Sequence, residues 1–560
     1  MKKLALSVLA VSVAMFAHAV GTWGSSTGGD VTNPANYSDG EPVDRIVFCK
    51  TQSAPVTASR DVSIATIQFH SEYYPFVGDI DLGAGRSLVA TGEFSLQSRA
   101  KVRLTSGILG IPLDAAATRQ VEFGRDLGDG NELVIDGPDS RFTTPLGKGM
   151  FAVRYNQHNL FKICNGASFE GVIQHAFMNA SASNNLILAT DPGTTFTIPT
   201  GHSSGDLRWG ESGSFNEFCV SNSAWLGQLS AAPVYIGIAN GSSPAGTANK
   251  LKVADKAVMD MRSTLNVGWS GAGSNALEVV DSATLYMTNA NPLNVGGSAN
   301  TFGNRVILAR GGKLVMSGLG GFNIGNNNTD RGSEMRIESG AEFRTLDNNA
   351  RCYCIGKAGT GAKLVIDGGT FYAPNGSLDQ APYGNNPSGS SVEVLNGGVI
   401  NVKGFNSGSA GSGHSLVVSN GYITTSSSAT FRLGVDGGRG SVLTIAGTNS
   451  QINCYGSSSF KGGCTINFNV PAEGFKRTPF YVNSTLQFVD ATTINVTVDN
   501  EFIYNASRAE RRVLLIKSPN AFDLGNVTFN LSEGLRLDTS VTGELAVVCP
   551  PGRGTLLLFK

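Results

Sequence analysis

The chain has 560 residues and little charge: Asp, Glu, Lys and Arg make up 15% of it, and the formal net charge is −1. A nearly neutral chain without a basic cluster is poorly suited to a phosphate backbone, so nucleic acid is not an expected partner. Glycine accounts for 71 residues, far above its usual share of about 7%. Together with abundant Asn, Ser and Thr, this composition favours many short strands joined by tight turns.

Residues 1–19 have the layout of a secretory signal peptide. Lys2 and Lys3 precede an apolar run over residues 4–16, and residues 17–19 read Ala-His-Ala. We therefore expect cleavage near Ala19 and a mature chain that is secreted or lies on the outer cell surface. No later stretch approaches the roughly 18 apolar residues of a transmembrane helix.

Residues 20–125 are expected to form an N-terminal capping region with the first, irregular coils. Trp23 opens this region. An Asn-aromatic-Ser-x-Gly-x-Pro stretch follows over residues 36–42, and an Asp-x-hydrophobic-x-Phe strand over residues 44–48.

Over residues 126–465 one short pattern returns about every 28 residues, a period typical of a solenoid. Each copy has two hydrophobic residues separated by one residue, then a polar pair, a small residue and another hydrophobic residue. Residues 161–169 read FKICNGASF and residues 335–343 read MRIESGAEF. The first hydrophobic residues of the twelve copies are Leu133, Phe161, Leu186, Phe218, Leu251, Leu277, Val306, Met335, Leu364, Val392, Leu416 and Leu443.

These repeats predict an all-β chain folded as a right-handed parallel β-helix of about twelve coils, with an N-terminal cap and a C-terminal β cap. Alternation of hydrophobic and polar residues indicates strands with one buried face. A second strand in most copies ends in a hydrophobic residue and Gly, as at residues 266–268 and 323–325. A propeller blade would need about 40–45 residues, which is more than the repeat supplies.

The turn after the second hydrophobic residue is rich in Asn and Asp, which tolerate left-handed backbone. Stacked coils would place these residues in one column, as a structural turn ladder. A carboxylate row that binds calcium is the functional alternative, but Asn is too frequent there, and we expect no metal or other cofactor. The ladder consists of Asn165, Asn222, Asp255, Asp281, Asn396 and Asn420.

All eight cysteines follow the signal peptide. Export permits disulfides, and Cys454 with Cys464 is the candidate pair for a short loop at the end of the array. Burial of several cysteines as apolar side chains is an equally open alternative. Cys352 and Cys354 lie two residues apart on one strand face and are not expected to bond to each other.

Residues 466–560 contain five or so further strand patterns, among them residues 493–498, 512–516 and 527–531. We expect a β-rich cap or a small sandwich, because eight tilted strands are the minimum for a membrane barrel.

The leading Trp23, the motifs over residues 36–48 and the stacked repeats over about 126–465 resemble autotransporter-type passenger domains. The resemblance implies a secreted right-handed β-helix. It does not extend to a C-terminal membrane barrel, so the export route stays open.

Two clusters of residues suggest chemistry: Asp136 and Asp139 near Arg141 in one turn, and a second cluster that is the better candidate. Asp206, Arg208, Trp209 and Glu211 combine carboxylates, a guanidinium and an aromatic ring, a set that suits a sugar. The Gly and Ser residues around them are typical of an open, solvated loop instead. A glycosidase would need two carboxylates about 5–10 Å apart, which the spacing does not establish.

The leading functional hypothesis is an exported, non-enzymatic β-solenoid that acts as a structural or adhesive protein, with a glycan or another surface protein as partner. The alternative is a carbohydrate-active β-helix enzyme, either a polysaccharide lyase or a hydrolase.

Overall fold

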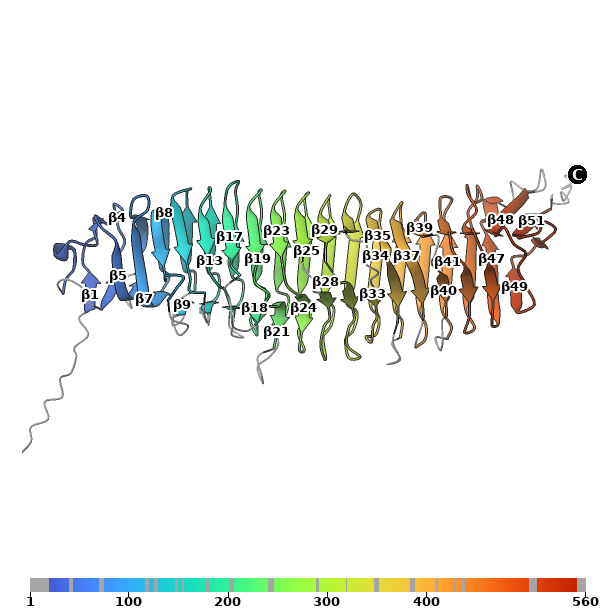
Figure 1. Cartoon of the computed structure of the whole chain (residues 1–560), viewed down its shortest axis with the longest axis horizontal. Helices are drawn as coiled ribbons and strands as arrows, with labels where there is room; N and C mark the ends of the chain where they lie inside the picture. Colours follow the sequence, from blue (N-terminus) through green and yellow to red (C-terminus); the bar gives the residue numbers. More distant parts are fainter. Residues whose placement is uncertain are drawn as a thin grey trace, which may run out of the picture.

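The strands of the computed structural model are stacked side by side into one elongated rod, which runs from the N-terminal region to the C-terminal region (Figure 1). The predicted signal peptide, residues 1–19, lies outside the described residues. The structure describes residues 20–39, 44–69, 75–115, 120–124, 129–146, 150–153, 156–177, 182–200, 206–239, 246–288, 292–318, 320–346, 352–382, 388–408, 411–426, 430–434, 439–502 and 511–550.

A typical coil contributes one strand to each of three columns. One coil holds β25 (Ala276–Val280), β26 (Thr284–Met287) and β27 (Leu293–Val295), and the next holds β28 (Arg305–Ala309), β29 (Lys313–Met316) and β30 (Phe322–Ile324). Each strand pairs in parallel with its counterpart one coil away, as β25 does with β28, β26 with β29 and β27 with β30. The predicted all-β parallel solenoid is therefore confirmed, and the first column of the described residues holds 19 strands. Its right-handed sense stays a prediction.

The first column pairs in parallel from β2 to β49 without interruption. Its remaining strands are β2 (Gly29–Asp30), β4 (Val56–Thr57), β6 (Val77–Asp81), β8 (Lys101–Gly110), β10 (Glu132–Asp136), β13 (Leu160–Cys164), β16 (Leu186–Ala189), β19 (Glu217–Val220), β22 (Lys250–Val253), β31 (Glu334–Glu338), β34 (Lys363–Asp367), β36 (Ser391–Leu395), β38 (Ser415–Ser419), β41 (Val442–Ala446), β44 (Thr465–Val470), β47 (Thr492–Val498) and β49 (Val527–Leu531).

The other two columns follow the same parallel register. The second column also holds β11 (Ser140–Thr143), β14 (Ser168–Glu170), β17 (Thr195–Ile198), β20 (Trp225–Gln228), β23 (Val258–Met261), β32 (Glu342–Thr345), β39 (Tyr422–Thr425), β42 (Gln451–Cys454) and β45 (Phe480–Val482). The third also holds β1 (Val20–Trp23), β3 (Arg45–Phe48), β9 (Gln120–Phe123), β12 (Met150–Val153), β15 (His175–Ala176), β18 (Leu207–Glu211), β21 (Val234–Ile238), β24 (Leu265–Trp269), β33 (Cys352–Ile355), β40 (Phe431–Leu433), β43 (Ser458–Phe460) and β46 (Leu486–Phe488).

Some strands are long enough to serve two columns. The second half of β8 enters the second column, where it pairs with β11. The strands that span the second and third columns are β5 (Val62–Phe69), β7 (Ser87–Leu96), β35 (Thr370–Gln380) and β37 (Val399–Ser407). In β35 the register shifts between Ala373 and Ser377, where the strand passes from one column to the next.

The columns continue through the two regions in which caps were expected. Strands β1 to β9 already follow the parallel register, and β44, β47 and β49 extend the first column. Among the strands that the structure describes, antiparallel pairing occurs at the C-terminal end, where β51 (Glu544–Cys549) pairs with β48 (Arg511–Lys517) and β50 (Arg536–Asp538). The short 3-10 helix η1 spans Pro34–Asn36. No helix in the described ranges is long and apolar enough to cross a membrane.

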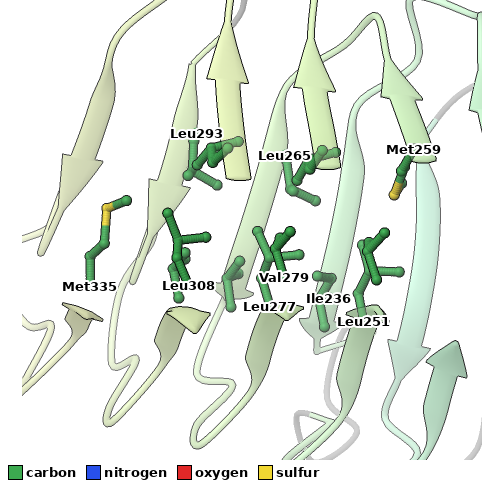
Figure 2. Packing of buried hydrophobic residues seen from close by; sticks show 14 of the residues in the cluster. Ile236, Leu251, Met259, Leu265, Leu277, Val279, Leu293, Leu308 and Met335 are labelled. Atoms are coloured by element: carbon green, nitrogen blue, oxygen red, sulfur yellow. The ribbon is translucent and has the colours of Figure 1, made fainter. Parts of the chain in front are cut away.

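The core is a stack of inward-facing hydrophobic side chains. Leu251, Leu277 and Val306 are opposite one another in successive first-column strands, and Met335 follows in the next coil. Figure 2 shows Leu251, Leu277 and Met335 packed in this interior beside residues of the other two columns, such as Met259 and Leu265. Aromatic rings stack in the same way; the centroids of Phe343 and Phe371 are 4.5 Å apart.

One predicted anchor is wrong by one residue. Phe161 faces Ile187 rather than Leu186, and Ile187 is the buried member of the pair. The reason is the run Leu186-Ile187-Leu188, which is hydrophobic on both strand faces. Alternation therefore gives no information on which residues point inward.

Candidate functional site

The cluster singled out from the sequence belongs to a strand of the rod. Arg208, Trp209 and Glu211 lie on β18, and Asp206 directly precedes it. The expectation of an open loop is therefore wrong for the three strand residues. The Gly and Ser content of the flanking sequence suggested a loop, but the parallel partners of β18 in the third column, β15 and β21, fix it as a strand.

Glu211 is the centre of the cluster, and its side chain is 0% exposed. His175 Nδ1 lies 2.5 Å from Glu211 Oε2, and Arg208 Nη1 donates to Glu211 Oε1 over 2.6 Å. Burial opposes ionisation of this carboxyl, but the hydrogen bonds and charges of His175 and Arg208 outweigh burial and hold its pKa below the usual value. Both carboxylate oxygens thus have partners.

The rest of the cluster is arranged around Arg208. Arg208 Nη2 lies 3.6 Å from Asp206 Oδ2, and their side chains are 29% and 33% exposed. Tyr235, opposite Arg208 on the next strand, has a pKa raised by burial and by the charge of Asp206. Trp209 points into the core, where its ring centroid is 4.7 Å from that of Phe218.

This geometry separates the four candidate glycan contacts. Trp209 is only 2% exposed, so its ring is not available to stack on a sugar, and the buried Glu211 is occupied by its two partners. Asp206 and Arg208 are accessible, and a glycan contact at these two residues stays a prediction. Sequence reasoning missed His175, which lies one coil earlier, opposite Arg208 in the strand register. The local spacing of 33 residues departs from the mean repeat of about 28, so the repeat length alone does not point to it.

The turn residues Asn165, Asn222, Asp255, Asp281, Asn396 and Asn420 all have left-handed backbone, with φ between 48° and 55°. Several amides reach the turn one coil earlier: Asn165 Nδ2 donates to Asp136, and Asn396 Nδ2 to Asp367, each over 2.8 Å. Arg310 binds Asp281 and lowers the pKa of its carboxyl. These bonds join neighbouring turns in pairs. Within the described part of the chain, no group of three or more His, Cys, Asp or Glu side chains is placed to hold a metal ion.

A continuous amide ladder lies elsewhere, at the buried position two residues before the inward anchor of each coil. The Nδ2 of each Asn donates to the Oδ1 of the next, over 2.8 to 3.3 Å. The same Oδ1 also accepts the backbone N–H of the preceding Asn. This ladder was not predicted, although an alignment of the twelve anchors shows an Asn two residues before most of the first seven. Its members are Asn131, Asn159, Asn185, Asn216, Asn249, Asn275 and Asn304.

The cysteines are free thiols. Cys454 and Cys464 are both buried, and their sulfur atoms lie near different partners: the carbonyl oxygen of Gly456 for Cys454 and the Thr492 hydroxyl for Cys464. The structure thus gives the predicted disulfide no support.

Cys352 and Cys354 place their sulfur atoms 3.0 Å apart, and the Cys352 thiol donates to Asp379 Oδ2 over 2.9 Å. The hydrogen bond with Cys354, burial and the charge of Asp379 raise the pKa of Cys352.

Two adjoining surface hollows lie towards the C-terminal end of the rod. The first has a volume of about 290 Å³ and is lined by Asn420, Tyr422, Asn449 and Arg477, among others. The second has a volume of about 420 Å³, and its charged lining residues are Glu473, Lys476, Arg477, Arg511 and Arg512. Arg477 therefore contributes to both.

No protein-family model matches the sequence, and no curated protein matches it either. One similar solved structure is the crystal structure of a TibC-catalyzed hyper-glycosylated TibA fragment, at 12% sequence identity and a TM-score of 0.23. The match covers 79% of this chain and 97% of that chain. At these values it says nothing about ligand or activity, and the fold assignment rests on the strand register described above.

Proposed function

We propose that this chain works outside the cell as a non-enzymatic β-solenoid, a structural or adhesive rod at the cell surface. The observation that carries the proposal is the parallel register of the first column, which is unbroken from β2 to β49. Stacked strands lie about 4.8 Å apart, so the 18 steps between β2 and β49 separate the two ends of this column by roughly 85 Å. A rod of this kind suits a spacer that presents a surface or an end away from the cell.

The outer face of the first column supports a structural role. Its charged side chains pair between successive coils: Lys101 with Glu132 at 2.7 Å, and Lys363 with Glu393 at 2.7 Å. Each exposed pair adds little stability, about 1 kcal/mol or less. Because such pairs recur along the rod, they nevertheless favour the alignment of each coil with its neighbours.

The enzyme alternative is less favourable because the best carboxylate candidate is enclosed. A glycosidase or lyase needs an acidic or basic side chain in contact with the sugar. Glu211 is 0% exposed and both of its oxygens are bound. The remaining carboxylate, Asp206, is accessible but lies beside Arg208 rather than opposite a second accessible acid.

The rod proposal is testable by shortening the array in register. Residues 276–362 span three whole coils, from the first residue of β25 to the residue before β34. Their removal should leave a folded protein whose long dimension in small-angle scattering is shorter by roughly 14 Å. Adhesion that depends on reach should weaken when this shortened chain replaces the full chain on the cell. An unchanged long dimension, or a protein found only inside the cell, would contradict the proposal.

The enzyme alternative has its own test. The purified chain should release no reducing or unsaturated ends from a panel of polysaccharides. Turnover that Glu211→Gln abolishes while the fold is intact would establish the alternative instead.

A further inference from the structure

The two hollows near the C-terminal end share Arg477, which lies at their junction. In the first hollow Tyr422 stands on the outer face of the second column, and Asn420 and Asn449 come from the turns of successive coils. At Gly397, no atom outside the glycine and its two chain neighbours lies within 4 Å of the place where a Cβ would be, so this side of the hollow is open.

The segment that carries Arg477 is fixed by the coil beside it. The backbone N–H of Lys476 donates to the Thr448 carbonyl oxygen over 2.9 Å, and Gln451 Nε2 donates to the Thr478 carbonyl oxygen over 3.3 Å. Arg477 is therefore held between two anchored neighbours. Its side chain is exposed and makes no ion pair or hydrogen bond with any described residue.

The cations of the second hollow differ in availability. Arg511 is used structurally, since its guanidinium donates to the carbonyl oxygens of Ala472 and Glu473, each over 3.1 Å. Arg512 is paired with Asp538 and Glu544. Lys476, like Arg477, is exposed and has no carboxylate partner within the described ranges. Two unpaired cations thus lie side by side where the two hollows meet.

We propose that these hollows bind an acidic polysaccharide, with a uronate residue of the sugar chain at Arg477. The inference rests on the proposed adhesive function and gives it a ligand class. The ring of Tyr422 offers a face for the apolar side of a pyranose, and the amides of Asn420 and Asn449 suit its hydroxyl groups. The Arg477 guanidinium matches the two oxygens of a carboxylate.

Arg477 lines both hollows, so a linear polymer crossing it places successive sugar residues in each. Lys476 then meets the next carboxylate along the polymer. A neutral sugar chain fits the tyrosine and the amides but leaves both cations without a partner.

The experiment uses the full chain without residues 1–19 and a matched pair of probes. Oligomannuronate and a β-1,4-linked mannan oligomer of equal length differ in the carboxylate at C6. Titration calorimetry should show binding of the mannuronate oligomer, weakened by added salt because exposed charges are screened. The mannan oligomer should bind at least about tenfold more weakly, since it lacks the charge-assisted hydrogen bond.

Two substitutions locate the site. Arg477→Gln should weaken mannuronate binding by about tenfold to hundredfold and leave the mannan affinity unchanged. Tyr422→Ala should weaken binding of both oligomers, whereas Tyr422→Phe keeps the ring and should preserve it. Arg432→Gln is the matched control, because Arg432 is an exposed arginine of β40 that lines neither hollow. Circular dichroism shows whether each variant is folded.

The outcomes are distinct. Equal affinity for the two oligomers, no binding of mannuronate, or equal effects of Arg477→Gln and Arg432→Gln would overturn the proposal. Tighter binding of polyphosphate or single-stranded DNA than of mannuronate would also overturn it, since the site would then select charge alone. If the shortened rod still changes adhesion while mannuronate fails to bind, the acidic-sugar site is wrong and the adhesive rod stands.

Discussion

A buried carboxyl group in the corner before β31 makes the stability of the rod depend on pH. Asp330 is fully buried, and its Oδ1 accepts hydrogen bonds from the hydroxyls of Thr301, over 2.7 Å, and Ser333, over 2.8 Å. Burial outweighs these hydrogen bonds and raises the pKa of Asp330 from 3.8 to about 6. No cation in the described part of the chain forms an ion pair with it.

The direction and size of the effect follow from this pKa. The carboxyl titrates near pH 6 in the folded protein and near 3.8 in the unfolded chain, so the folded state binds a proton more readily between these values. The raised pKa corresponds to about 3 kcal/mol of destabilisation at pH 7 and above. As the pH falls through 6 towards 4, this penalty disappears and the folded state gains stability.

The assay is a comparison of Asp330→Asn with the parent chain. In urea titrations, the free energy of unfolding of the parent should rise as the pH is lowered from 7.5 to about 5. The variant should lack this rise, because an amide does not titrate. The difference between the two pH dependences is the informative quantity, since the absolute stability of the variant also reflects its new amide group. Thr301→Val removes a hydrogen bond that stabilises the charged form of Asp330, so it should raise the folded-state pKa. The rise in the free energy of unfolding should then begin at a higher pH than in the parent. Parallel pH dependences of Asp330→Asn and the parent would refute the reasoning.

Three further predictions concern the hydrophobic core, the buried amide ladder and the buried Glu211 carboxylate. Ile337→Asp places an unpaired carboxylate in the core and should cost several kcal/mol and unfold neighbouring coils, while Glu338→Asp on the outer face should be nearly neutral in the same denaturant titration. Asn216→Ala leaves buried amide groups without partners and should cost roughly 2–5 kcal/mol, whereas Asn222→Gly in an exposed left-handed turn should change the melting temperature little. Glu211→Gln should lower stability near pH 7. Because the pKa of Glu211 is depressed, its contribution is complete above its unfolded value of 4.5 and is lost as the pH falls through the folded value, so the gap to the parent should close in acid.

The architecture was predictable because every coil must bury one face of its strands against the neighbouring coils. A period near 28 residues and alternation such as Met335-Arg336-Ile337 indicate a strand that buries one face. The prediction failed at Leu186, where both faces of the strand are hydrophobic. Only the partner strand decides the register there, and that information is not local.

The candidate site was less predictable because its partners come from different coils. His175 and Glu211 meet only when β15 and β18 are stacked, and nothing within either segment reveals the contact. Glycine and serine near residue 211 suggested an open loop, but burial of Glu211 depends on the strands on either side of it. Local composition reports the flexibility of the chain, whereas burial is decided by tertiary packing.

The buried amide ladder shows how the same position is used differently along the rod. From Asn131 to Asn275 every coil supplies an amide that donates to the next one, and the ladder ends at Asn304, because the next coil has Ser333 at this position. A hydroxyl is too short to span the roughly 4.8 Å between stacked coils and replace both bonds. Beyond it the same buried column holds Ala362 and Ser390, so these later coils cohere without side-chain amide bonds at this position. The hydrophobic pattern is uniform along the chain, but the polar interactions that hold successive coils in register are not. The N-terminal half of the array is therefore specified by two overlapping signals, a hydrophobic period and an asparagine period. In the C-terminal half this column has no asparagine period and holds other polar residues, such as Cys464 and Thr492, whose side chains contact each other at 3.7 Å.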